Sequence, residues 1–329
     1  MQRVLSGIRA TGRLHLGNYL GAVKGMLELQ DDPRYQTLYM VADTHTLTTP
    51  YVIDELRVNR RQVIIDYLAA GLDPEKSVLF LQSMVPQHTE LAFYFSSVTS
   101  IARMQHLPTF KDKVKQHPDS ATMALLNYPI LMAADILVYN AELVPVGIDQ
   151  EPHLEISREI ARKMNQEYGT HFPEPQRFAT TGEYVPSLQG TGKMSKSVEG
   201  SYITLTDEYE TILKRLSAAP TDSGKGATVP AEGGVANLFK FVELFQGAAK
   251  RAEYEQAYTS TGLSYKTVKV DLAQAIAAEL KPLQEKRREI AADTKYVDTV
   301  IAEGAKKARA IAEETMMLVR ENLGLGYKE

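Results

Sequence analysis

Short apolar runs rich in β-branched residues alternate with helical patterns over the first half of the chain, and this alternation restricts the possible folds most. The expected strands are Val4–Ile8, Thr37–Ala42, Val78–Gln82 and Leu143–Val146. The helical patterns between and after them cover Asp54–Ala70, Glu90–Arg103, Thr122–Asn140 and Pro152–Tyr168. Strands joined by helices run parallel through right-handed crossovers. We therefore predict an α/β fold with a doubly wound parallel sheet, whose ligands bind at the carboxyl ends of the strands.

Strand patterns stop at Asp207, and Ala, Glu, Lys and Leu dominate the rest of the chain. Amphipathic spacing there predicts helices over Glu208–Ser217, Val235–Gln246, Asp271–Asp293 and Thr294–Asn322. The length of 329 residues also suits two domains. We therefore predict an α/β domain over residues 1–206 and a helical domain over residues 207–329.

The absence of cysteine excludes several kinds of chemistry: disulfides, iron–sulfur clusters, cysteine-bound zinc and thiol nucleophiles. The net charge of −4 argues against a protein that binds polyanions with its whole surface. The sequence has neither a signal-peptide pattern nor a long uncharged apolar run, so we expect a cytoplasmic protein without a membrane segment. All seven histidines lie at or before His171, which assigns any imidazole chemistry to the α/β domain.

The connection between the first strand and the following helical pattern contains Gly7, Gly12 and Gly17. Glycine lets the backbone lie close to a ligand, and the N-terminus of a helix favours an anion. A tight turn without a ligand would need the same glycines. The sequence of this connection favours a ligand, because His15-Leu16-Gly17-Asn18 resembles the HIGH signature of class I aminoacyl-tRNA synthetases, with Asn18 where the last histidine often stands.

A second segment, Lys193-Met194-Ser195-Lys196-Ser197, matches the KMSKS signature of the same class in all five positions. Lysines on a mobile, glycine-flanked loop can close over a triphosphate and stabilise the charge that grows on the leaving pyrophosphate. The basic run Phe110–Lys115 is ambiguous, because most such runs are solvated helix faces. In the family it resembles, a lysine of this run approaches the triphosphate, and the match places it at Lys113.

Asp135 lies within a strongly apolar helical segment, where an unpaired carboxylate would be costly to bury. It therefore needs a donor. A structural hydrogen bond from a neighbouring tyrosine or lysine is one interpretation. The other is an acceptor at the bottom of a ligand pocket, with walls formed by Met132, Ile136, Val144 and Val146.

The chain as a whole resembles bacterial tryptophanyl-tRNA synthetases. The resemblance is carried by Ser6-Gly7-Ile8, Gly17–Ala22, Leu131–Leu137 and Val144–Gln150, and it extends from Ser6 to Gly326. It implies a Rossmann-like catalytic domain, and an enzyme that activates L-tryptophan with ATP and transfers the tryptophanyl group to tRNA(Trp). The tyrosyl enzymes share this architecture but are not similar in these four strings.

The resemblance assigns three sets of residues. Catalysis falls to His15, Asn18, Lys113, Lys193 and Lys196. Tryptophan would bind to Gly7, His45, Tyr128, Met132, Asp135, Ile136, Val144, Val146 and Gln150. ATP would bind to Arg9, Ala10, Thr11, Gly17, Asn18, Gly147, Ile148, Asp149, Val185, Lys193, Met194, Ser195, Lys196 and Ser197. Asp135 would accept the indole N–H, while Tyr128 and Gln150 would hold the substrate ammonium group close to His45.

The chain departs from the family at Arg9-Ala10-Thr11-Gly12, where relatives usually carry Gln-Pro-Ser-Gly. Arg9 adds a cation beside the reacting carboxylate and phosphate. Two alternative functions stay open: a tyrosyl-type synthetase, because a phenol O–H also donates to a carboxylate, and a synthetase-like protein that binds nucleotide or RNA without catalysis. The resemblance further implies Mg²⁺ bound with ATP, no protein-bound metal, a homodimer formed through the α/β half, and tRNA contacts from basic residues of the helical domain.

Overall fold

The computed structural model describes residues 1–116, 121–179, 184–190, 192–196 and 198–326; within the first range, the side chains of Lys113 and Gln116 are not described. The chain divides into two compact units. The sheet unit contains residues 1–12, 25–180 and 293–329, and the helical unit contains residues 13–24 and 181–292. Among the described residues, no helix has both the length and the apolar character needed to cross a membrane.

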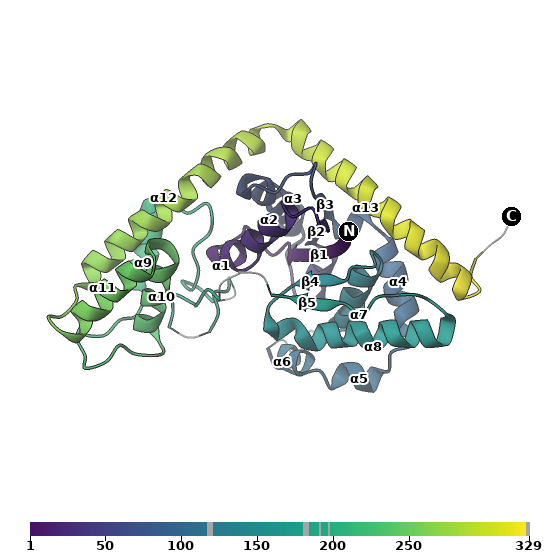
Figure 1. Ribbon diagram of the computed structural model, residues 1–329, viewed down its shortest axis with the longest axis horizontal. Coiled ribbons are helices and arrows are strands. Elements are labelled where there is room, and N and C mark those ends of the chain that lie inside the picture. The colour runs from purple at the N-terminus through teal and green to yellow at the C-terminus, as the bar shows by residue number, and fades with distance from the viewer. Residues whose placement is uncertain (117–120, 180–183, 191, 197, 327–329) are drawn as a thin grey trace. The chain divides into compact units, whose positions relative to one another are not determined.

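A five-stranded parallel sheet forms the centre of the sheet unit, in the order β3-β2-β1-β4-β5 (Figure 1). Its strands are β1 (Gln2–Arg9), β2 (Tyr35–Ala42), β3 (Val78–Leu81), β4 (Leu143–Pro145) and β5 (Gln176–Phe178). The chain builds outward from β1 to β3 on one side and from β4 to β5 on the other. The order therefore reverses between β1 and β4, and ligands of such sheets bind at this position. The prediction of a doubly wound parallel sheet is confirmed. Strand β5 was not predicted, because three residues are too few to carry a periodic signal.

The helices of the sheet unit are α2 (Lys24–Gln30, all but its first residue), α3 (Ile53–Ala70), α4 (Gln87–Ser96), α5 (Ile101–Gln105), α6 (Pro108–Gln116), α7 (Met123–Leu137), α8 (Glu151–Tyr168) and α13 (Thr294–Asn322). The expected single helix over 90–103 is wrong, because the structure has two helices there. Ser97 and Thr99 donate their hydroxyls to the carbonyls of Tyr94 and Phe95, and Ser100 caps α5. Hydroxyl side chains that bond the nearby backbone favour such breaks.

The last helix, α13, belongs to the sheet unit and packs on β3, α4 and α3. Gly304 lies against the carbonyl of Leu79 in β3 and leaves no space for a Cβ. Its buried Ala308, Ala312 and Met316 belong to the same apolar core as Phe80. The domain boundary expected at 206/207 thus differs from the division in the structure. An amphipathic pattern shows that a helix has a buried face, but it does not show which partner covers that face.

The helical unit consists of α1 (Leu16–Asn18), a π-helical turn (Tyr19–Val23), α9 (Tyr209–Ala218), α10 (Gly234–Gln246), α11 (Ala248–Thr259) and α12 (Tyr265–Ala292). Buried Phe239, Phe241 and Ile276 contribute to its interior. Helix α11 was not predicted. Asp222 organises the loop before α10 by accepting hydrogen bonds from the hydroxyls of Tyr258 (2.6 Å) and Tyr265 (2.7 Å).

Candidate active site

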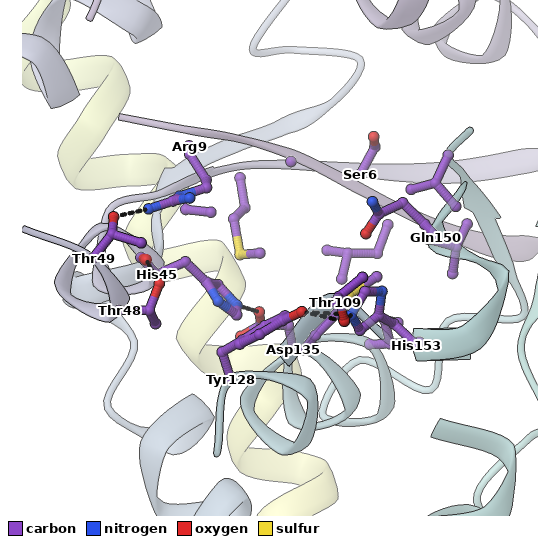
Figure 2. A pocket seen from close by; sticks show the side chains of 18 of the residues that line it. Ser6, Arg9, His45, Thr48, Thr49, Thr109, Tyr128, Asp135, Gln150 and His153 are labelled. Atoms are coloured by element: carbon purple, nitrogen blue, oxygen red, sulfur yellow. Dashed lines mark hydrogen bonds and ion pairs between the residues drawn. The ribbon is translucent and has the colours of Figure 1, made fainter. Parts of the chain in front are cut away.

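A cavity of about 370 Å³ opens at the carboxyl ends of β1 and β4, within the sheet unit (Figure 2). It lies at the position where the strand order reverses. All nine residues assigned to tryptophan in the sequence line this one cavity: Gly7, His45, Tyr128, Met132, Asp135, Ile136, Val144, Val146 and Gln150. The structure also places Leu5, Met40, Thr109 and His153 in its wall. Residues far apart in the sequence are thus brought together around one space.

The walls of the cavity are mainly apolar, and helix α7 supplies one of them. Met132, Asp135 and Ile136 lie three and four residues apart, so they share a face of this helix. Gly7 in β1 contributes to the wall without a side chain, because a Cβ there would come within 3.0 Å of the Met40 carbonyl oxygen. The sheet therefore approaches the cavity closely at a position where a side chain would fit poorly.

Asp135 is 1% exposed, and its carboxylate has three partners. Oδ1 accepts from Gln82 Nε2 at 2.7 Å and lies 2.6 Å from His88 Nδ1, while Oδ2 lies 2.7 Å from His45 Nε2. His88 Nε2 continues the chain to the buried Tyr139 hydroxyl at 2.8 Å. The structural interpretation of Asp135 named a neighbouring tyrosine or lysine as the donor, and it is wrong in this respect, because the donors are two imidazoles and an amide.

The ionisation of Asp135 follows from these contacts. Burial raises its pKa, but the charge and hydrogen bonds of His45 and His88 outweigh burial and lower the pKa to about 2. A carboxylate has about four lone-pair positions. Three are used here, two on Oδ1 and one on Oδ2, so Oδ2 retains one acceptor position. The floor of the cavity therefore presents an ionised acceptor.

A second polar group surrounds Tyr128. Its hydroxyl donates to Thr109 Oγ1 at 2.9 Å and lies 2.7 Å from His153 Nε2. Burial raises the pKa of Tyr128, which keeps the phenol protonated. Gln150, also at the cavity wall, donates to Asp149 Oδ2 at 2.7 Å. The contacts of its hydroxyl with Thr109 and His153 hold Tyr128 in a fixed position.

Sequence reasoning missed Gln82, His88, Thr109 and His153. Two signals were available for the histidines. His88 follows the third predicted strand within a few residues, and His153 lies just after Val144–Gln150. Polar residues beyond the carboxyl ends of parallel strands are candidates for a site. Nothing comparable marks Thr109.

Arg9 ends β1 and also lines the cavity. Its Nη2 donates to Thr49 Oγ1 at 3.0 Å, while its buried Nε has no hydrogen-bond partner. Ala10 and Thr11, which were grouped with Arg9 in the sequence, are outside the cavity wall; Ala10 is buried and Thr11 is exposed. In the sheet unit, Gly147, Ile148 and Asp149 form the turn between β4 and α8, with Ile148 exposed.

His15 and Asn18 in the helical unit fix each other's positions. The His15 backbone N–H donates to Asn18 Oδ1 at 3.2 Å, and the Asn18 N–H donates to His15 Nδ1 at 3.3 Å. Since Nδ1 accepts, the ring proton of the neutral imidazole is on Nε2. Burial, together with the charges of Lys196 and Lys193, lowers the pKa of His15 to about 4. The side chain is therefore a neutral N–H donor at physiological pH.

Gly17 joins the two signature segments within the helical unit. A Cβ at this position would meet the His15 ring at 2.9 Å and Met194 Cβ at 3.3 Å. Met194 is itself buried, and its N–H donates to the carbonyl of buried Val185 at 3.0 Å. Lys193 is exposed, Lys196 is half-buried, and both lie close enough to affect the pKa of His15. Ser197 and the Lys113 side chain lie outside the described parts of the chain.

Comparison with known proteins connects these features. The family described as tRNA synthetases class I (W and Y) matches residues 1–281. The tryptophan–tRNA ligase of Porphyromonas gingivalis is 40% identical over 329 residues, which cover 98% of this chain and 99% of that protein. The enzyme of Clostridium tetani is 40% identical over 327 residues, which cover 98% and 95%. Tryptophanyl-tRNA synthetase of Campylobacter jejuni, solved with ADP and tryptophan, has a TM-score of 0.85 and 34% identity, covering 98% of this chain and 100% of that one.

The parallel sheet and both signature segments agree with these matches. The chain therefore belongs to the class I tRNA synthetases of the tryptophan and tyrosine type. Its full-length likeness to tryptophan–tRNA ligases narrows the family further. It is a bacterial-type tryptophanyl-tRNA synthetase. The expectations of fold class, enzyme class and family drawn from the sequence are confirmed.

Proposed function

We propose that the enzyme joins L-tryptophan to ATP, releases pyrophosphate, and transfers the resulting tryptophanyl group from the adenylate to tRNA(Trp). The observation that carries this proposal is the acceptor position on Asp135 Oδ2 at the floor of an apolar cavity. An indole presents one donor and no acceptor, and the remaining surface of its ring is apolar. Its shape and polarity therefore match the cavity.

The tryptophan site comprises the nine assigned residues that line the cavity. The indole N–H donates to Asp135, and the ring lies between apolar side chains such as Met132 and Val144. Tyr128 and Gln150 hold the ammonium group of the substrate. The Campylobacter jejuni enzyme, solved with ADP and tryptophan, supports binding of both kinds of ligand.

In the helical unit, His15 Nε2–H, Asn18 and the lysines of the signature loop bind the phosphates of ATP. In activation, a carboxylate oxygen of tryptophan attacks the α-phosphorus. The bond from the α-phosphorus to the bridging oxygen breaks, and its electron pair leaves on pyrophosphate. Lys193 and Lys196 stabilise that growing charge.

Mg²⁺ is proposed to arrive bound to ATP. Among the described residues, no group of three or more His, Asp or Glu side chains is arranged to hold a metal ion. Phosphate oxygens are hard ligands that suit this cation. When bound, the ion would neutralise charge on the β- and γ-phosphates, while the protein contributes the lysines.

The direct test is ATP–pyrophosphate exchange measured with each of the twenty amino acids. We expect tryptophan to support the fastest exchange, because its ring combines one N–H donor with a large apolar surface, as the acceptor and the apolar walls of the cavity require. Exchange that is as fast with tyrosine would replace the assignment by a tyrosyl-type enzyme. Nucleotide binding without any exchange would leave a non-catalytic binding protein.

Basic residues of α12 are the proposed tRNA contacts. Because aminoacylation of tRNA takes place where proteins are made, we also propose a cytoplasmic enzyme. Lys281, Lys286 and Arg288 lie on this helix, whereas Arg287 is buried and has a structural partner. Lys306, Lys307 and Arg309 lie on α13 and so belong to the sheet unit. The resemblance also implies that residues 207–329 bind the tRNA anticodon, and we propose this function for α12 and not for the whole of that range.

We also propose a homodimer formed through the sheet unit. Helices α4 and α7 border a groove of about 280 Å³ that is lined by Leu47, Phe93 and Leu131, and the Phe93 side chain is 76% exposed. Such an exposed apolar surface indicates an interface. Thr48 and Tyr128 line both this groove and the tryptophan cavity. A second copy of the chain at the groove would therefore support one wall of the tryptophan site.

Phe93→Asp is expected to convert the dimer to a monomer and to lower the affinity for tryptophan, because the charge cannot be buried in an apolar interface. Light scattering at micromolar concentration and indole fluorescence would measure the two effects. Leu318→Asp, at a residue of α13 that is 65% exposed, is the matched control. An unsubstituted protein that is monomeric and fully active in aminoacylation would contradict this proposal.

A further inference from the structure

Arg9 carries a positive charge into the tryptophan cavity, and no acidic side chain neutralises it. Among the described residues, its only hydrogen-bond partner is the neutral hydroxyl of Thr49, at 3.0 Å. Asp135 is the one acidic residue in the cavity wall, and its carboxylate is engaged by His45, Gln82 and His88. Within the described part of the chain, the cation therefore has no acidic counter-charge.

Burial of this guanidinium costs free energy unless a ligand supplies a partner for its charge and its free N–H groups. Its Nε is buried and makes no hydrogen bond. Burial lowers the pKa of Arg9, and only the nearby Tyr128 counteracts this effect. A buried charge without a partner is unfavourable, and a guanidinium offers donors in a planar fork that matches a carboxylate or phosphate.

The two charged residues of the cavity lie at different sides of it. Figure 2 shows Arg9 and Thr49 on one side, Gln150 and His153 on another, and Tyr128 with Asp135 along a third. A ligand whose apolar ring donates an N–H to Asp135 would also need an anionic group near Arg9, to pair with the guanidinium. An amino acid has one such group, its carboxylate.

We propose that Arg9 binds the carboxylate of the substrate amino acid and selects for it, an inference that rests on the proposed function. Thr49 holds Nη2 and so orients the guanidinium, which lines the cavity beside the ligand. Arg9 is thus a substrate-binding residue of the amino-acid site, although its place in the sequence grouped it with the residues assigned to ATP.

The chemistry of activation predicts which kinetic constant Arg9 controls. The carboxylate is anionic before the reaction, and it loses that charge when its oxygen bonds to the α-phosphorus. The negative charge then accumulates on pyrophosphate. A contact to the carboxylate is therefore strongest in the ground state, so its removal should raise the Kd and KM for tryptophan more than it lowers kcat.

Binding of tryptophan and of tryptamine in the absence of ATP tests the proposal. Tryptamine retains the indole and the ammonium group but lacks the carboxylate. The protein contains no tryptophan, so the indole fluorescence of either ligand reports binding directly. The experiment compares the unsubstituted enzyme with Arg9→Met and Arg9→Lys, and uses Arg57→Met at an exposed residue of α3 as the control.

We expect the unsubstituted enzyme and the control to bind tryptophan about ten- to a hundredfold more tightly than tryptamine, which is the range for a charge-assisted hydrogen bond. Arg9→Met should remove most of this preference while still binding tryptamine, and retained tryptamine binding shows that the cavity is folded. Arg9→Lys should keep part of the preference.

An unchanged preference in Arg9→Met would overturn the inference. A normal affinity for tryptophan combined with slow activation would also overturn it, because Arg9 would then act on the phosphate. Failure of the unsubstituted enzyme to bind tryptophan at all would overturn the proposed function, and this inference with it.

Discussion

Lys196→Ala is expected to slow the formation of tryptophanyl-adenylate by about 10²- to 10³-fold, the usual effect of losing one group that stabilises developing charge. The affinity for tryptophan should change little, because the lysine acts on pyrophosphate and not on the amino acid. Lys193→Ala should show the same pattern with a smaller loss, since Lys193 is exposed and Lys196 is half-buried. Pre-steady-state measurement of adenylate formation separates the rate from binding.

The matched control for these variants is Lys266→Ala, an exposed lysine on α12. It removes the same charge from the helical unit at a residue outside the signature loop. An activation rate that stays unchanged in Lys196→Ala at saturating ATP and Mg²⁺ would refute the role. His15 gives an independent readout: because Lys196 lowers its pKa, the variant should raise the midpoint of the imidazole titration from about 4.

Asp135→Ala is expected to weaken tryptophan binding by about ten- to a hundredfold or more and to destabilise the sheet unit as well. The substrate N–H would lose its acceptor, at a cost of about 1–3 kcal/mol. His45, His88 and Gln82 would lose theirs too. Each buried donor that loses its acceptor costs about 1–3 kcal/mol in the free energy of unfolding. Fluorescence titration and thermal unfolding measure the two effects.

Asp135→Asn separates recognition from folding, because an amide retains one acceptor and the imidazoles can change tautomer. We expect it to fold more stably than Asp135→Ala and to bind tryptophan with intermediate affinity. Discrimination against benzothienylalanine, which lacks the N–H, should fall in Asp135→Ala. If Asp135→Ala instead keeps both the affinity for tryptophan and this preference, the carboxylate has only a structural role.

The fold could be predicted to a large extent because its signals are local. Val4–Ile8 and Thr37–Ala42 are apolar runs that form strands in any context that covers both faces, and both became central strands. The three- and four-residue spacing in Thr122–Asn140 predicted α7 in the same way. The expected helix at 90–103 failed because the bonds of Ser97 and Thr99 to the backbone compete with the helical pattern.

The residues that line the cavity could be assigned from the sequence because they lie in the short motifs that carry the family resemblance. Leu131–Leu137 places Met132, Asp135 and Ile136 on one helical face, whatever the rest of the chain does. The partners of Asp135 were beyond reach, since Gln82, His88 and His45 lie 53, 47 and 90 residues away. Their meeting depends on the order of β1, β2 and β3 and on the packing of α4 against α7.

By itself, then, the sequence determined the alternating elements, the two signature segments and the lining of the tryptophan cavity, since each depends on residues that are near neighbours or on strings whose spacing sets one helical face. The tertiary structure alone decided that α13 packs on the sheet, that imidazoles hold Asp135, and that Arg9 lines the cavity with no acidic partner among the residues described. The physical reason is common to all three. Burial of an apolar face and pairing of a charge both depend on residues that are distant in the sequence. A local pattern predicts that such a partner exists, but it does not identify the partner.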